Sequence, residues 1–190
     1  AMTANNLGIL LKDLGESEEA RKLFKEALEI RRRLAEENPK AYLDKVAETA
    51  NNLGNPLPKL GERKEARKLY EEALTIRRRL AEENPKAYLQ YVATTANNLG
   101  ILCLDENKPA EAGPLAAEAV LYHARLVPTA PPVFGPRLAA SINLARRLYH
   151  DSGFDQREEW LKELKQRLTE ATTPEFANEI IGQITQPPQD

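Results

Sequence analysis

The hexapeptide Thr-Ala-Asn-Asn-Leu-Gly occurs three times in this chain, beginning at Thr3, Thr49 and Thr95. The spacing is 46 residues in both intervals, and residues 3–48 and 49–94 differ at 12 positions, which leaves 34 of 46 identical. Internal identity of this kind is typical of repeat architectures, in which each unit buries its apolar face against its neighbours. We therefore expect the chain to fold as a stack of equivalent units.

Each copy contains two stretches with helical periodicity, because small and apolar residues recur at spacings of three and four. Between the stretches, Gly15 suits a left-handed helix cap, and Asn107 holds the same place in the third copy. The pattern predicts antiparallel helical hairpins. Pro56 and Pro58 fall inside the first helix of the second copy, so that helix should end early or kink near Leu57.

The copies become less alike toward the C-terminus. We assign residues 1–126 to three repeats of period 46, 127–137 to a proline-rich connection, 138–185 to a divergent fourth repeat with capping helices, and 186–190 to a tail. Asn143 lies 45 residues after Asn98, which predicts that the array slips by one residue. The helical pattern is already running at Ala1 and Met2, which suggests a cloning remnant on a fragment of a larger protein.

The composition excludes several classes of function. With 27 basic and 29 acidic residues the net charge is -2, which argues against a nucleic acid partner. No apolar run is long enough for a membrane span and no secretory signal is seen, so we predict no membrane contact and a cytoplasmic location. Cys103 is alone, and neither a metal-ligand cluster, a phosphate-binding loop nor a nucleophile motif accompanies it. We predict no enzyme activity, no cofactor and no metal.

The residues at the core positions carry a resemblance to a known family. Leu7-Gly8, Leu11, Gly15, Ala20, Phe24 and Ala27 resemble the spacing of the tetratricopeptide repeat, with Ala4 in place of its usual large aromatic residue. The resemblance covers roughly residues 2–125, and the long unit is similar to those of kinesin light chain and of bacterial sensor and scaffold proteins. It implies an all-α, right-handed superhelical solenoid of about three regular repeats and a divergent capping repeat. Its first helices would line a concave groove.

The asparagine pairs lie opposite the Ala4 and Leu7 side on a helical wheel, so we expect them in the groove. A primary amide donates and accepts hydrogen bonds, so a column of them can hold an extended peptide backbone. The family resemblance places the second asparagine of each pair on that column. The alternative interpretation is that residues such as Asn5 bond neighbouring helices. The predicted peptide-binding residues are Asn5, Asn6, Lys45, Asn51, Asn52, Asn55, Tyr91, Asn97, Asn98 and Asn143.

These observations predict a scaffold or adaptor module that binds a peptide or protein partner in the groove. The alternative is a self-assembly module of a larger sensor or signalling protein, which would form a homo-oligomer through an uncapped repeat end. The arginine runs 31–33 and 77–79 are followed by glutamates within about a turn and predict a solvated convex face. His123 is expected at the surface.

Overall fold

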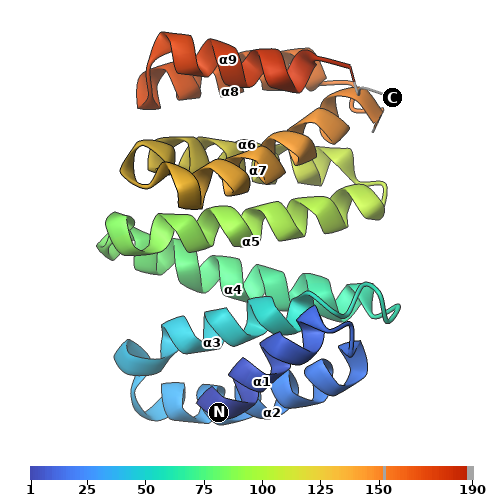
Figure 1. The fold of residues 1–190 in the computed structure, drawn as a ribbon, viewed down its shortest axis with the longest axis vertical. Coiled ribbons are helices and arrows are strands. Elements are labelled where there is room, and N and C mark those ends of the chain that lie inside the picture. Colours follow the sequence, from blue (N-terminus) through green and yellow to red (C-terminus); the bar gives the residue numbers. More distant parts are fainter. Residues whose placement is uncertain (152, 188–190) are drawn as a thin grey trace. The chain divides into compact units, whose positions relative to one another are not determined.

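The computed structural model describes residues 1–151 and 153–187, and every regular element in these ranges is helical (Figure 1). This confirms the all-α prediction. The elements are α1 (Met2–Asp13), α2 (Ser17–Glu37), α3 (Pro39–Gly54), α4 (Arg63–Glu83), α5 (Pro85–Asp105), α6 (Pro109–Leu126), the 3-10 turn η1 (Val127–Thr129), α7 (Pro131–Asp151), α8 (Arg157–Ala171) and α9 (Pro174–Thr185).

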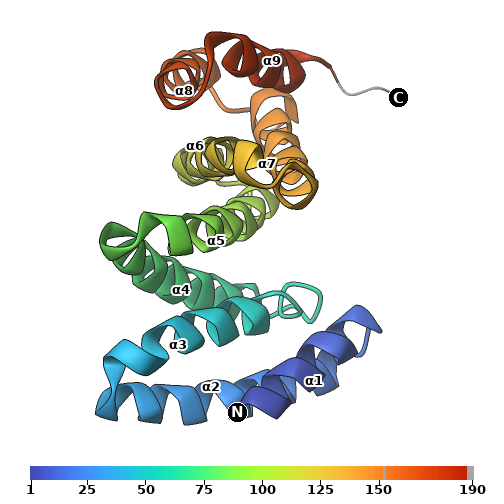
Figure 2. The ribbon, with the colours of Figure 1, turned by 60° about the vertical axis from the view of Figure 1, so that its left-hand side comes forward.

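The chain divides into two compact units, residues 1–88 and 89–190, and the boundary falls inside α5. In the first unit, α2 packs against α1 and α3, and α3 packs against α2 and α4. In the second unit, α6 packs against α7 and α8, and α9 packs against α7 and α8. Within the first unit, α1 with α2 and α3 with α4 form hairpins of antiparallel helices (Figure 2).

A left-handed residue closes each hairpin at the same place in the repeat. The backbone φ angle is 87° at Gly15, 80° at Gly61, 58° at Asn107 and 64° at Gly153. The amide of the residue after Gly15 donates back to the carbonyl of Leu11 at 2.9 Å, which is the long bond of a Schellman cap. The predicted roles of Gly15 and Asn107 are confirmed.

The fourth copy keeps the spacing of the first three. The left-handed residues lie 46 apart up to Gly153, and α3, α5 and α7 begin at prolines that are also 46 apart. The predicted slip of one residue is therefore wrong, because a slip would turn every following side chain by about 100° around its helix. Asn143 is the counterpart of Asn97, since 143 minus 97 is 46, and Leu144 replaces the second asparagine.

The prolines of the second copy shorten its first helix, as predicted. Helix α3 has 16 residues and ends at Gly54, whereas α5, which lacks these prolines, has 21 and runs to Asp105. Proline cannot donate the backbone hydrogen bond that continuation of α3 would need. The closing turn is nevertheless kept, since the amide of Glu62 donates to the carbonyl of Leu57 at 2.9 Å.

The predicted connection over residues 127–137 is mostly helix, so that boundary was wrong. Helix α7 begins at Pro131, and only residues 127–130 link it to α6. Pro131 and Pro132 occupy the first turn of α7, where the backbone amides have no partner within the helix, so proline is tolerated there. The predicted tail begins after α9, and residues 188–190 lie outside the described ranges.

In each hairpin of the first unit, a glycine of the first helix lies against an aromatic ring of the second helix. A Cβ atom added to Gly54 would lie 2.6 Å from Cε1 of Tyr70, and one added to Gly8 would lie 2.8 Å from Cε1 of Phe24. Both rings are buried. The aromatic ring of the second helix therefore fills the space that a larger residue at the glycine would require.

Replacing Gly54 with alanine should destabilise the first unit by roughly 1–3 kcal/mol, because the added methyl group must displace the ring of Tyr70. The matched control is Gly182→Ala in α9, where nothing lies within 4 Å of the added atom and the helix should gain up to about 1 kcal/mol. Urea denaturation of the three chains measures both changes. Equal stability of the two variants would contradict the close-packing account.

Candidate functional site

The first asparagine of each predicted pair lies inside the protein. Asn5 has only 1% of its surface exposed, and Asn51 and Asn97 are also buried. The predicted placement of these three residues on the open groove is therefore wrong. The cause is visible at Asn5, whose Oδ1 accepts from Asn52 Nδ2 at 3.3 Å and lies 3.4 Å from the hydroxyl of Thr49. Asn5 thus bonds a neighbouring helix, which was the alternative interpretation.

The second asparagine of each pair is more accessible. Asn6 is exposed, and Asn52 and Asn98 are partly exposed. The amide of Asn52 is already used in the bond to Asn5, so this residue serves the link between α1 and α3 as well. Asn143 is exposed on α7, although it corresponds in sequence to the buried asparagines.

Arg31 on α2 is buried and anchors the adjoining α3. Its Nη1 atom donates to the backbone carbonyl of Lys45 at 3.0 Å and to Glu48 Oε2 at 3.0 Å, and it also contacts the hydroxyl of Thr49. Arg77 is buried as well, whereas the other four arginines of the two runs are exposed. The predicted solvated face was therefore wrong for Arg31 and Arg77. In each run, only the first arginine is buried, and Arg31 reaches the next hairpin.

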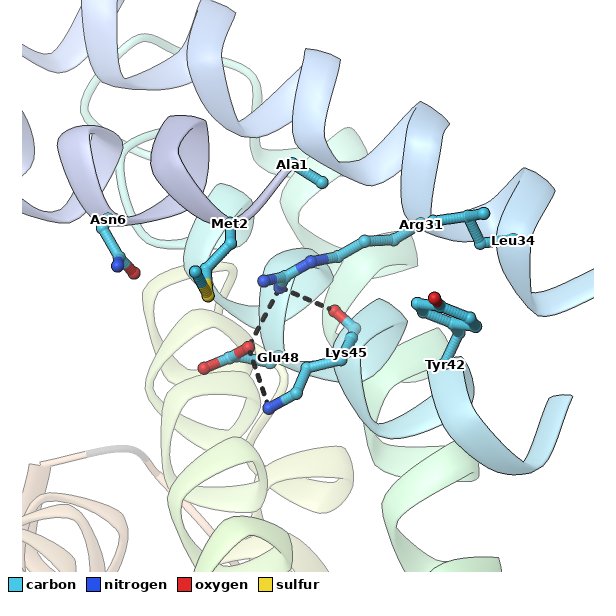
Figure 3. A pocket seen from close by; sticks show the side chains of 8 residues that line it. All are labelled: Ala1, Met2, Asn6, Arg31, Leu34, Tyr42, Lys45 and Glu48. Carbon is cyan, nitrogen blue, oxygen red and sulfur yellow. Dashed lines mark hydrogen bonds and ion pairs between the residues drawn. The ribbon is translucent and has the colours of Figure 1, made fainter. Parts of the chain in front are cut away.

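Arg31, Lys45 and Glu48 line a pocket of about 380 Å³ in the first unit (Figure 3). Its walls come from the beginning of α1, from α2 and from α3. Lys45 Nζ lies 3.8 Å from Glu48 Oε2 and 3.6 Å from Asp44 Oδ2, so its charge is partly compensated. The lining residues are Ala1, Met2, Asn6, Arg31, Leu34, Tyr42, Lys45 and Glu48.

Two of the predicted binding residues, Asn6 and Lys45, line this pocket. Asn55 does not, because its Oδ1 accepts from the hydroxyl of Tyr70 at 2.9 Å in the turn after α3. That phenol is buried, and burial raises its pKa well above the ordinary value. Tyr91 lies in the second unit, where its side chain is exposed on α5.

In the second unit, His123 and Ser141 stand where the first unit has Arg31 and Thr49. Each is two repeats, or 92 residues, further along the chain. Ser141 Oγ lies 2.9 Å from Nδ1 of His123, and both side chains are buried. The predicted surface position of His123 was therefore wrong. Burial, with a smaller effect from the charge of Arg137, lowers the pKa of His123 to about 4.

Sequence reasoning missed Arg31, Glu48 and Tyr42 as residues of the site. One signal was present, because the arginine and the threonine change together: Arg31 and Arg77 accompany threonine, and His123 accompanies serine. A coupled change at fixed spacing indicates contact between the two positions.

Residues 1–151 and 153–187 hold neither a candidate metal site nor a candidate membrane span. No group of three or more His, Cys, Asp and Glu side chains is placed to hold a metal ion. Within the same ranges, no helix is both long and apolar enough to cross a membrane.

The neighbours Asn5 and Asn6 should behave differently when each is replaced with alanine. Asn5→Ala removes a buried acceptor and leaves the amide of Asn52 without it, so the free energy of unfolding should fall by about 1–2 kcal/mol. Asn6→Ala, at an exposed position, should change it by less than about 0.5 kcal/mol. Both changes raise helix propensity equally, so chemical denaturation compares them directly. A loss as large for Asn6 as for Asn5 would count against the assignment.

The stability of the second unit should depend on pH through His123. The unfolded chain takes up a proton near the ordinary pKa of 6.5, whereas the folded chain does so only near 4. Stability is therefore lost as the pH falls through this window, by about 2 kcal/mol between pH 7 and pH 5. His123→Gln should flatten that dependence in denaturation curves at the two pH values. An unchanged pH dependence in the variant would contradict the buried neutral imidazole.

Comparison with known proteins agrees with this geometry. Residues 1–79, which span the first hairpin and most of the second, match the family model described as tetratricopeptide repeat. No curated protein sequence gives a significant match to the chain. The likeness to kinesin light chain stays a resemblance. The family match over residues 1–79, the recurrence of 46 residues and the helical hairpins together support a tetratricopeptide repeat protein.

Proposed function

We propose that this chain is a scaffold module that binds an extended peptide or a partner protein, and that the pocket around Asn6 and Lys45 is part of its binding surface. Tetratricopeptide repeats mediate protein–protein interaction and belong to a non-catalytic scaffold class. The observation that carries the proposal is the pocket itself. It is lined by two predicted binding residues, Asn6 and Lys45, and by the hydrogen-bonded pair of Arg31 and Glu48. The proposal assigns the chain no catalytic role and no cofactor.

The chemistry of the pocket favours an apolar side chain on a hydrogen-bonded backbone. Met2, Leu34 and Tyr42 supply apolar wall, and a volume of about 380 Å³ is within the range of ligand sites. The amide of Asn6 is exposed at the rim and can both donate to and accept from a peptide unit. These features fit a peptide segment whose backbone hydrogen-bonds to the side-chain amide of Asn6 while one apolar side chain enters the pocket.

The charges of the pocket weigh against a strongly acidic partner. Arg31 is bonded to Glu48, and Lys45 lies between Asp44 and Glu48, so two cations face two carboxylates. A partner carboxylate would have to compete with these internal ones. We therefore expect the pocket to select an apolar residue, with Lys45 contributing to the orientation of the peptide rather than to binding of an acidic tail.

Self-association is the second candidate. Large apolar side chains on α1 are exposed, namely Met2, Leu7 and Leu10, and such residues gathered on one helix are typical of an interface. Light scattering over a range of concentrations distinguishes self-association from binding of a different partner. A molecular mass that stays that of the monomer would exclude self-association.

Peptides selected from a random linear library on the immobilised full chain should depend on the pocket. The double variant Asn6→Ala, Lys45→Ala should weaken most selected peptides by about tenfold or more, as expected for two hydrogen-bonding groups at about 1 kcal/mol each. Lys22→Ala, an exposed lysine of α2 outside the pocket, is the matched control and should change affinity less than twofold. The proposal would be contradicted if no peptide bound, or if the selected peptides bound the double variant with unchanged affinity.

A further inference from the structure

A second pocket lies entirely within the second unit, and no residue of the first helices α5 and α7 lines it. Its volume is about 340 Å³, within the range of small-ligand sites. The end of α6 and the turn η1 form one wall, and the turn between α8 and α9 forms the other. We call it the turn pocket, and its lining residues are Arg125, Val127, Pro128, Ala171, Thr172, Thr173 and Phe176.

The wall from α6 and η1 differs from the earlier copies at the positions that carry charge. Arg125 is the counterpart of Arg33, 92 residues earlier, which is followed by glutamates three and four positions further on. In the third copy, Pro128 and Thr129 replace those glutamates, and Val127 replaces an alanine. Glutamates at such spacings can compensate the charge of an arginine on a helix surface. The third copy therefore keeps the cation and loses both carboxylates.

The proline also changes the backbone of this wall. Proline has no amide hydrogen, and inside a helix its ring clashes with the carbonyl four residues earlier. Helix α6 accordingly ends at Leu126, whereas α2 continues to Glu37, the counterpart of Thr129. The chain instead makes the 3-10 turn η1, in which Thr129 Oγ1 donates to the carbonyl of Leu126 at 2.6 Å. Val127 and Pro128 thus belong to a turn that lines the pocket and no longer to a continuous helix.

Few polar groups of the lining are available to a ligand. Thr172 Oγ1 donates to the carbonyl of Leu168 at 2.7 Å, and Thr173 Oγ1 accepts from the amide of Phe176 at 3.2 Å. Within residues 1–151 and 153–187, the hydroxyl proton of Thr173 has no acceptor and Arg125 has no ion pair. No acidic or amide side chain lines the pocket. The lining therefore offers one positive charge and one hydroxyl donor beside an apolar wall.

We propose that the turn pocket binds a small carboxylic acid with an apolar body, an aryl or branched alkyl carboxylate. The carboxylate pairs with the guanidinium of Arg125, whose planar donors match its two oxygens, and accepts from the hydroxyl of Thr173. The partly exposed ring of Phe176 contacts the apolar body of the acid. The proposal does not rest on the proposed function, because the two pockets lie in different units.

Other ligand classes fit the turn pocket less well. An extended peptide backbone needs groups that both donate and accept, as Asn6 does in the first unit, and the turn pocket holds no amide side chain. A polyanion would bring several charges to one cation and an apolar wall, where the remaining charges would lose water without gaining a partner. A single carboxylate on an apolar body matches both the charge and the wall.

The test titrates the full chain with three probe acids, phenylacetate, phenylpropanoate and methylpentanoate, and follows the backbone amide signals by NMR. We expect the signals of Val127, Thr172, Thr173 and Phe176 to shift progressively with at least one acid, because these residues line the pocket. The uncharged amide of the same acid should bind at least about tenfold more weakly, since it cannot form a charge-assisted pair with the guanidinium. Acetate should shift none of these signals, because it lacks the apolar body.

Three variants locate the site. Arg125→Gln removes the charge and should weaken binding of the acid about tenfold or more. Pro128→Glu restores the glutamate of the earlier copies three positions after Arg125, so it should weaken binding in the same way. Arg33→Gln is the matched control at the counterpart arginine, outside both pockets, and should change the affinity less than about twofold. All three positions are exposed, so the melting temperatures should stay close to that of the original chain.

The proposal would be overturned if none of the three acids shifted the lining signals at about 10 mM, a concentration that detects even weak ligands. It would also be overturned if Arg125→Gln left the affinity unchanged. A third contrary result is binding of a short peptide that ends in phenylalanine by a pocket that takes none of the free acids, because the occupant would then be the C-terminus of a protein.

Discussion

The buried hydroxyl of Thr49 joins the first two hairpins. It contacts Arg31 from α2, lies within reach of Asn5 on α1 and belongs itself to α3, so three helices meet at one polar group. A buried polar group that loses its partner costs about 1–3 kcal/mol, so a shift of one residue between the hairpins would be penalised at several atoms at once. This constraint explains why the spacing of 46 persists where identity is lost. In the second unit, His123 and Ser141 make the contact that Arg31 and Thr49 make in the first unit, and both side chains are smaller than their counterparts.

The same constraint decides which groups remain for a partner. Asn5 and Arg31 are used inside the protein, so Asn6 and Lys45 are the predicted binding residues that line the pocket of the first unit. Because the lining residues Arg31 and Glu48 are held by bonds between α2 and α3, the pocket is organised before anything binds, and less conformational entropy is lost on binding. Under the proposed function, the structural and the binding roles are divided between the neighbouring residues Asn5 and Asn6.

The sequence predicted the features that depend on local chemistry. The hairpins follow from the helical period, their closing turns from Gly15 and its counterparts, and the short α3 from Pro56. It did not predict the burial of Asn5 or Arg31, because each depends on a hairpin that follows in the chain. A helical wheel assigns one buried side to a helix, whereas a helix within a stack has two, one toward its own partner and one toward the neighbouring hairpin. The extent of α7 was missed because prolines indicate a loop unless they fall in a first helical turn.

The central claim is that Asn5 holds neighbouring helices together and that Asn6 contacts the partner. The most direct measurement is the NMR spectrum of the side-chain amides during titration with a bound peptide. The account predicts that the two amide signals of Asn6 shift progressively, while those of Asn5 stay in place and exchange slowly with solvent because the residue is buried. Shifts at Asn5 with unchanged signals at Asn6 would contradict it.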